Sequence, residues 1–461
     1  MLFNSLPFAL FLGTFLLLWQ LSGGRPWRRW LLLIGSWLFY ASFSAPFLLL
    51  LLLSTALDYR IGRALESQEA PWARKALLAA SLVGNLGLLV YFKYGTFLLS
   101  IVGLTVAPEA QVFHVEGSIP PGISFYTFQT LSYTIDVYRR RSPACQDPVD
   151  FAIYVSFFPQ LVAGPIVRIH EFLPQLRALS GASRAQAVRG AELFALGLVK
   201  KVVIADNIGV LIDPVFSDVG SYTAPTLALA AVMFSAQVYC DFSGYSTMAR
   251  GLAQMLGFKL PRNFDYPWLA SSPLGFRRGW HLTMSHWFRD YVFHPLGGTR
   301  HGAARTSLNL MVVWGLFGLW HGAGWTFLAW GLYNGLAQIV YRGLEKRIVL
   351  PAFPGRAVLG WLLTVGFLVP SCLLFRAPSL ADGFSALVRI ATLQADGLAR
   401  LEPWWPALAA LLLAHVASRR FYDEAALRRL GWPGRIVVLG AAAILVLFAA
   451  PAQRPFIYFQ F

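Results

Sequence analysis

Long apolar runs separated by short basic loops make up most of the chain. The first runs from Leu6 to Leu21 and precedes an arginine-rich loop, and two more follow at 30–43 and 47–57. These runs lack the alternation of apolar and polar residues that a membrane β-strand requires. Because a membrane-spanning helix needs about 20 mainly apolar residues, the pattern predicts transmembrane helices.

Further apolar segments recur to the end of the chain, about eleven in all, and some are half-length. We therefore predict an all-α, polytopic bundle that forms one domain over residues 1–461. Prolines and a glycine interrupt the segment 151–168, which predicts a broken or re-entrant helix. The segment 379–393 has the pattern of an amphipathic helix at the membrane interface.

Charged residues at the segment ends give the expected topology. Basic loops follow the first and third segments, which predicts an outside N-terminus and cytoplasmic basic loops. Asp58 is expected to begin the loop that extends to Lys75, and the polar stretch 108–118 is expected outside the bilayer. Lys200 and Lys201 are expected to snorkel from an interfacial helix. The polar stretch 171–189 is predicted to be a surface linker.

Composition agrees with a membrane protein. Of 461 residues, 57% are hydrophobic and 13% are charged, about half the charged fraction of a typical soluble domain. The net charge of +16 lies mostly in short loops, which favours orientation in the membrane and contact with anionic lipid over nucleic-acid binding. A basic cytoplasmic mouth would also attract an anionic substrate.

Two histidines stand out as candidates for catalysis. His321 lies inside an apolar run between Trp320 and Trp325, and His281 follows Trp280 in a basic, aromatic loop. Burial should lower the pKa of such an imidazole and keep it neutral, so that it can accept a proton as a general base. A histidine satisfied by packing is the alternative. The two are far apart in sequence, so only the fold can bring them together.

The sequence lacks the motifs of metal sites, serine hydrolases and nucleotide-driven enzymes. The histidines at 281, 286, 294 and 301 do not have the spacing of a metal site, and the three cysteines are scattered. The sequence has no serine-hydrolase elbow and no phosphate-binding loop. Asp241 adjoins an apolar segment, which makes it a functional candidate, although a helix N-cap or a salt bridge to Arg250 or a loop arginine is the more common explanation.

Several motifs together resemble the membrane-bound O-acyltransferase family, in its bacterial branch of alginate O-acetyltransferase membrane subunits and teichoic-acid D-alanyltransferases. They follow one another in family order at 121–130, 157–168, 241–246, 280–281, 289–291 and 320–323. By this resemblance His321 is the catalytic histidine and His281 the supporting one. The family usually reads Phe-Trp-Arg-Arg-Trp-His where this chain has Phe-Arg-Arg-Gly-Trp-His at 276–281, so the shape of that loop is expected to differ.

The resemblance implies a multi-pass enzyme of the cytoplasmic (inner) membrane, with a central tunnel. It would pass an acetyl group from a cytoplasmic thioester, acetyl-CoA, towards hydroxyls of an extracytoplasmic polysaccharide, directly or through a secreted or periplasmic acetyltransferase. It would hold no bound cofactor and no metal. Further candidates for substrate binding are Asp241, Arg278, Trp280 and Trp320.

A transporter or flippase for an acyl or lipid-linked group, without a covalent step, is the alternative function. The sequence shows no convincing internal repeat and no paired intramembrane carboxylates, which are common in such proteins. We therefore favour the acyltransferase.

Overall fold

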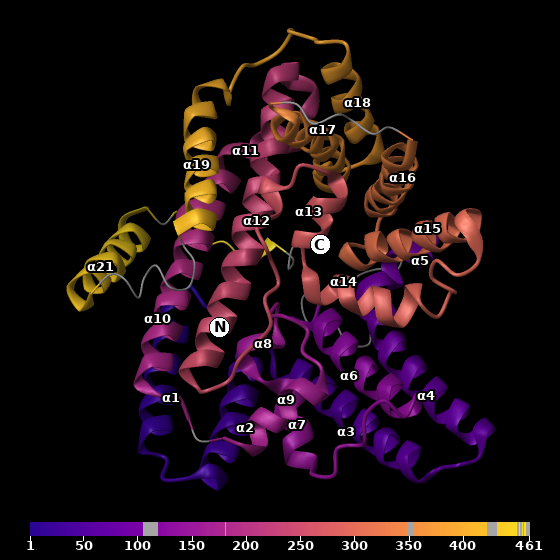
Figure 1. The fold of residues 1–461 in the computed structure, drawn as a ribbon, viewed down its shortest axis with the longest axis vertical. Coiled ribbons are helices and arrows are strands. Elements are labelled where there is room, and N and C mark those ends of the chain that lie inside the picture. The colour runs from indigo at the N-terminus through magenta and orange to yellow at the C-terminus, as the bar shows by residue number, and fades with distance from the viewer. Residues whose placement is uncertain are drawn as a thin grey trace. The chain divides into compact units, whose positions relative to one another are not determined.

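The computed structural model describes residues 1–104, 119–179, 181–347, 354–421, 431–449, 451, 454, 456 and 457. Within these residues the chain forms helices and turns and no β-strand, which confirms the predicted all-α class (Figure 1). The stretch 108–118, expected outside the bilayer, lies outside the described residues.

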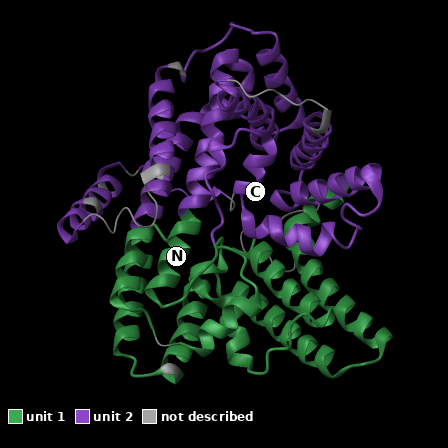
Figure 2. Cartoon of the chain, in the orientation of Figure 1, with its two compact units in different colours: residues 1–194, 245–261, 460 green, residues 195–244, 262–459, 461 purple. Residues whose placement is uncertain are grey.

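The chain divides into two compact units (Figure 2). The first comprises Met1–Phe194 and Tyr245–Pro261, and the second comprises Ala195–Gly244 and Arg262–Phe459. All the candidate site residues belong to the second unit. The single domain over residues 1–461 stays a prediction.

The first unit begins with the helices predicted from the apolar runs. Its helices are α1 (Leu6–Leu21), α2 (Arg25–Ala41), α3 (Ala45–Ser67), α4 (Pro71–Leu89), the π-helical turn Val90–Tyr94, α5 (Gly95–Ile101), α6 (Ile123–Tyr138), α7 (Pro148–Ser156), α8 (Phe158–Leu161), α9 (Ile169–Arg177) and most of α10 (Arg184–Leu198). The bounds of α1 coincide with the predicted run. The predicted break in 151–168 is confirmed, because α7 ends at Ser156 and α8 at Leu161.

A buried polar cluster explains why α3 is longer than predicted. The Asp58 carboxylate accepts hydrogen bonds from Ser81 (2.5 Å) and Asn85 (2.8 Å) of α4 and from Thr134 (3.1 Å) of α6. These donors satisfy the carboxylate inside the unit, so the helix continues through Asp58 to Ser67. The prediction that Asp58 begins a loop is therefore wrong. The linker predicted at 171–189 is also wrong, because α9 and the start of α10 occupy it.

The second unit holds the longer C-terminal set of helices. They are the π-helical turn Val199–Ala205, α11 (Asp206–Ser217), the 3-10 turn Val219–Ser221, α12 (Ala224–Met255, which continues into the first unit), the 3-10 turn Pro267–Leu269, α13 (Pro273–Gly279), α14 (Leu282–Phe288), the π-helical turn Arg289–Phe293, α15 (Gly302–His321), α16 (Trp325–Arg347), α17 (Arg356–Arg376), α18 (Leu380–Ala391), the 3-10 turn Glu402–Trp404, α19 (Trp405–Phe421) and α21 (Trp432–Ala449).

Two glycines bring α15 and α16 into close contact. A Cβ atom on Gly318 would lie 2.3 Å from the carbonyl oxygen of Phe327, and one on Gly331 would lie 2.2 Å from that of Trp314. No side chain fits at either position, so the two backbones pack directly against each other. This contact fixes the part of α15 that ends at His321.

Four helical stretches among the described residues are long and apolar enough to cross a membrane. They are Ala45–Ser67, Pro71–Ile101, Ala224–Met255 and Arg356–Arg376, and shorter apolar helices cover Leu6–Leu21, Trp405–Ala417 and Trp432–Val446. These helices support a multi-pass membrane protein. The count of about eleven segments, the outside N-terminus and the central tunnel stay predictions.

Candidate active site

His321 is the last residue of α15 and is surrounded by aromatic rings. Its side chain is 3% exposed, and its ring centroid lies 4.6 Å from that of Trp320, 4.9 Å from Trp330 and 5.2 Å from Phe375. The helix stops here because Gly322 is extended, and a Cβ atom on Gly322 would lie 2.1 Å from the Phe327 ring. The imidazole is therefore held at a fixed point at the end of a helix.

His281 lies in the turn between α13 and α14. It is fully buried and has a left-handed backbone with φ of +43°, which is uncommon for any residue other than glycine. Asn263 secures this turn, because its carbonyl oxygen accepts from the backbone of Leu282 at 2.9 Å and its side chain accepts from Thr283 at 3.0 Å. Burial lowers the pKa of the His281 imidazole to about 3, so the ring is neutral at physiological pH.

One indole ring contacts both histidines. The centroid of Trp320 lies 5.7 Å from that of His281 and 4.6 Å from that of His321. Trp320 is itself 3% exposed. The fold thus gathers two imidazoles around a single tryptophan, although their positions in the sequence are distant.

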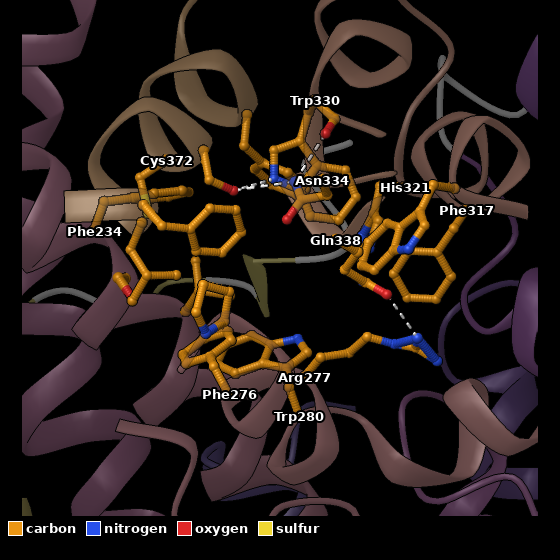
Figure 3. Close-up of a pocket in the computed structure, with 18 of the residues that line it drawn as sticks. Phe234, Phe276, Arg277, Trp280, Phe317, His321, Trp330, Asn334, Gln338 and Cys372 are labelled. Atoms are coloured by element: carbon orange, nitrogen blue, oxygen red, sulfur yellow. Dashed lines mark hydrogen bonds between the residues drawn. The ribbon is translucent and has the colours of Figure 1, made fainter. Parts of the chain in front are cut away.

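A cavity opens beside His321 (Figure 3). Its wall comes from six helices. It includes Phe234 and Val238 of α12, Phe276 and Arg277 of α13, Trp280 just after α13, Ser285 of α14, Phe317 and His321 of α15, Trp330, Asn334 and Gln338 of α16, and Ser371, Cys372 and Phe375 of α17. Most of these groups are apolar, and a few polar side chains converge among them. This combination is typical of a small-molecule site.

The polar groups of the cavity bond to one another across helices. Ser371 accepts hydrogen bonds from the Trp330 indole at 2.9 Å and the Asn334 amide at 3.2 Å, and Gln338 accepts one from Arg277 at 3.1 Å (Figure 3). The orientations of the amides are therefore fixed before a ligand enters, which lowers the cost of binding.

A second cavity shares part of this wall and carries more positive charge. Arg277, Arg289 and Arg342 all line it, together with the part of α15 from Leu310 to Phe317. Burial and then the neighbouring arginines lower the pKa of Arg277 to about 10. Arg289 pairs with Asp290 at 2.8 Å, whereas none of the described residues forms an ion pair with Arg342. The cavity therefore presents an excess of cationic groups.

The remaining sequence candidates lie in different places. Trp280 lines the first cavity, whereas Arg278 is exposed on α13 and lines neither cavity. Asp241 is buried in α12 and lines neither cavity. Its substrate-binding role and those of Arg278, Trp280 and Trp320 stay predictions. Among the described residues, no three His, Cys, Asp or Glu side chains gather as a metal site.

Lys201 does not snorkel as expected. It is 4% exposed, and its ammonium group pairs with Asp206 at 2.7 Å and Asp241 at 2.9 Å. Burial raises the pKa of Asp206 to about 6, although Lys201 opposes that rise. The salt bridge of Asp241 is to Lys201, from the segment just before α11, where the sequence had suggested Arg250 or a loop arginine.

Two cavity residues could have been found from the sequence. Asn334 and Gln338 are amides four positions apart in an otherwise apolar run, so they share one face of a helix. A pair of amides on one face of an apolar helix indicates a polar wall or a polar contact. Arg342, four positions further on, continues the same face to the second cavity.

Comparison with known proteins agrees with the motifs. The sequence model of the membrane-bound O-acyltransferase family matches residues 47–380. The probable alginate O-acetylase of Pseudomonas aeruginosa is 37% identical over 442 residues, which cover 92% of this chain and 83% of the relative. The peptidoglycan O-acetyltransferase of Helicobacter pylori is 33% identical over 429 residues, covering 87% and 80% respectively. A teichoic acid D-alanyltransferase of Lacticaseibacillus rhamnosus is 28% identical over 297 residues, covering 57% and 72%.

Proposed function

Because the chain belongs to the membrane-bound O-acyltransferase family, we propose that it passes an acetyl group from a cytoplasmic thioester to hydroxyls of an extracytoplasmic polysaccharide. The names of two relatives, an alginate O-acetylase and a peptidoglycan O-acetyltransferase, support an acetyl donor and a glycan acceptor. The protein would act in the cytoplasmic (inner) membrane. The acceptor hydroxyl belongs to the glycan itself or to a periplasmic acetyltransferase that relays the group.

His321 acts as the general base in this proposal. The observation that carries the assignment is its position, buried among aromatic rings yet in the wall of the first cavity. As the acceptor oxygen attacks the thioester carbonyl, its proton moves to the imidazole. The new C–O bond forms, the C–S bond breaks, and the departing thiolate takes the proton back from His321. Such acid–base help contributes about 10²–10⁴-fold in rate.

His281 acts as a neutral hydrogen-bonding group. Because its pKa is held near 3, it does not take up the proton of the reaction. A fixed imidazole N–H directed at the developing oxyanion would stabilise the transition state without any reorganisation at the moment of reaction. Trp320 contacts both histidines and so keeps their spacing constant.

The arginine-lined cavity supports a phosphate-bearing donor such as acetyl-CoA. Guanidinium groups bind phosphate oxygens in bidentate fashion, and three of them line this cavity. Arg300 and Arg305 lie near the start of α15, and three basic residues, Arg342, Lys346 and Arg347, lie near the end of α16. By the positive-inside rule, this favours a cytoplasmic location for this end. From Leu310 in this cavity to His321 the helix spans eleven residues, or about 16 Å.

A vesicle assay separates this proposal from a carrier. Purified protein is reconstituted with acetyl-CoA and an acceptor glycan, and the free thiol of CoA is measured. An enzyme releases the thiol, whereas a transporter or flippase moves the group without releasing it. His321→Ala should lower release by at least about 100-fold. His301→Ala, which changes an exposed histidine of the same region, should leave it unchanged. Near-wild-type release by His321→Ala would show that His321 is not the base.

A further inference from the structure

Three residues close to the end of the chain pack into the interior of the second unit. We call Arg454, Phe456 and Ile457 the tail segment. The backbone N–H of Ile457 donates to Asp241 at 2.7 Å, and Arg454 donates to Asp213 at 2.8 Å. Phe456 is 2% exposed. The tail segment is thus fixed at both ends by carboxylates, one on α11 and one on α12.

Both carboxylates are held in place by other cations. Asp241 also pairs with Lys201 at 2.9 Å, and the second oxygen of Asp213 accepts from Arg376 at 3.0 Å. The side chains of Asp241 and Lys201 are 3% and 5% exposed, so this pair is shielded from water. A buried carboxylate with fixed partners makes a rigid anchor, because moving it would separate charges in a medium of low dielectric.

A continuous set of ring contacts leads from the tail segment to His281. The Phe456 ring lies 5.6 Å from that of Phe242, and the Phe242 ring meets the His281 imidazole edge-on at 4.6 Å. Phe242 directly follows Asp241 in α12, so the anchor and the ring that touches His281 are neighbours on one helix. The left-handed backbone of His281 is unfavourable for an L residue, so its surroundings must hold it there.

We propose that the tail segment positions His281 for the reaction. Asp241 fixes the backbone of Ile457, Phe456 then presses on Phe242, and Phe242 holds the imidazole in its working orientation. Asp241 and Phe456 are therefore positioning residues, and neither touches substrate. The proposal rests on the role of His281 in the proposed function. It gives Asp241 a purpose other than substrate binding.

The cavities allow this role to be separated from binding. Neither Asp241 nor the tail segment lines the two cavities, so changes there leave the donor's walls intact. Phe456→Ala should therefore lower kcat by about 10- to 100-fold through misplacement of His281, with KM for acetyl-CoA unchanged. Phe456→Leu, which keeps most of the apolar volume, should stay within about threefold of wild type.

A double-mutant cycle tests whether the effect passes through His281. In a His281→Ala background, Phe456→Ala should change kcat by less than about twofold, because the group that it positions is gone. Phe172→Ala serves as the matched control, since it removes an equally buried ring from the first unit. Whatever its size, that control effect should be the same in both backgrounds. If Phe456→Ala does not accumulate, Phe456→Val takes its place in the same cycle.

A second readout does not depend on activity. Carbethoxylation by diethylpyrocarbonate, located by mass spectrometry, should modify His281 at least about fivefold faster in Phe456→Ala than in wild type, because only loosened packing admits the reagent. The rate at His321 should not change. Equal losses of kcat in both backgrounds, or unchanged labelling of His281, would overturn the proposal. If His281→Ala has full activity, the assigned role of His281 fails instead, and the labelling still decides whether the tail segment holds the ring.

Discussion

Gly331→Ala should impair the enzyme through the contact between α15 and α16. The added Cβ atom would lie 2.2 Å from the carbonyl oxygen of Trp314 and 3.1 Å from the Cα atom of Gly318, and ordinary contact begins at 3.4 Å. Both obstacles are backbone or next to it, so no side chain can rotate away. To restore contact with Trp314, the helices must separate by about 1.2 Å at this point.

That displacement acts on both sides of the cavity. α15 carries Trp314 and His321, and α16 carries Trp330 and Asn334. A misplacement of about 1 Å can cost roughly 100-fold in rate, so kcat/KM should fall by that order. Overpacking should also lower the free energy of unfolding by about 1–3 kcal/mol, because the new methyl group has no space.

The assay is thioester-dependent CoA release by purified protein, with thermal unfolding measured in parallel. Gly343→Ala is the matched control, since it makes the same substitution on α16 where nothing lies within 4 Å. It should keep full activity and add up to about 1 kcal/mol of stability, because alanine favours helix. If Gly331→Ala were as active as Gly343→Ala, close glycine packing would not control the geometry of the site.

Three other outcomes are expected. Arg342→Gln should raise KM about tenfold for acetyl-CoA and leave it unchanged for acetyl-pantetheine, which lacks phosphates, and equal shifts for both donors would exclude a phosphate site. The pKa of His281 in the folded state is about 3, below its ordinary 6.5, so below pH 6.5 the unfolded chain binds a proton that the folded protein does not. The free energy of unfolding therefore falls as the pH drops below 6.5. By pH 5 the loss is about 2 kcal/mol, and the melting temperature of His281→Gln should therefore fall less between pH 7 and 5 than that of wild type. Lys201→Met leaves Asp241 and Asp206 buried without their cation and should cost about 3–5 kcal/mol in chemical unfolding, whereas a loss below 1 kcal/mol would mean that water reaches them.

The helices were predictable wherever hydrophobicity alone decides their bounds. Residues 6–21 form α1 as expected, and the prolines at 159 and 165 mark a real break. The unusual position of His321 was also visible, because an imidazole in an apolar run stands out by composition. These features depend only on residues that are neighbours in the sequence, so the sequence alone is enough to predict them.

The surroundings of charged residues inside the units are not predicted by the sequence. Local sequence predicts that a helix ends at Asp58 and that the Lys201 side chain extends to the membrane interface. The reason is that a charged side chain next to apolar sequence is usually solvated by water. Both are instead satisfied by side chains from elsewhere, Asp58 by α4 and α6 and Lys201 by Asp206 and Asp241. Local rules cannot anticipate such partners, since the pairing exists only after the chain has folded.

Most of the cavity wall could also not be predicted from the sequence. His281 and His321 could be assigned through the resemblance, but their common contact with Trp320 depends on how α14 and α15 pack. Asn334 and Gln338 carried a readable signal in their four-residue spacing. No sequence pattern indicated that Arg277 and Arg342 line one cavity, because α13 and α16 are distant in sequence.

The most direct test is a structure of the protein with a non-hydrolysable acetyl-CoA analogue in lipid nanodiscs. The account predicts the acyl carbon beside His321, close enough for one acceptor oxygen to touch both, at about 3–3.5 Å from each. The phosphates should lie against Arg277 and Arg342. An analogue that occupies another site, or one whose acyl group lies out of reach of the His321 imidazole, would contradict the account.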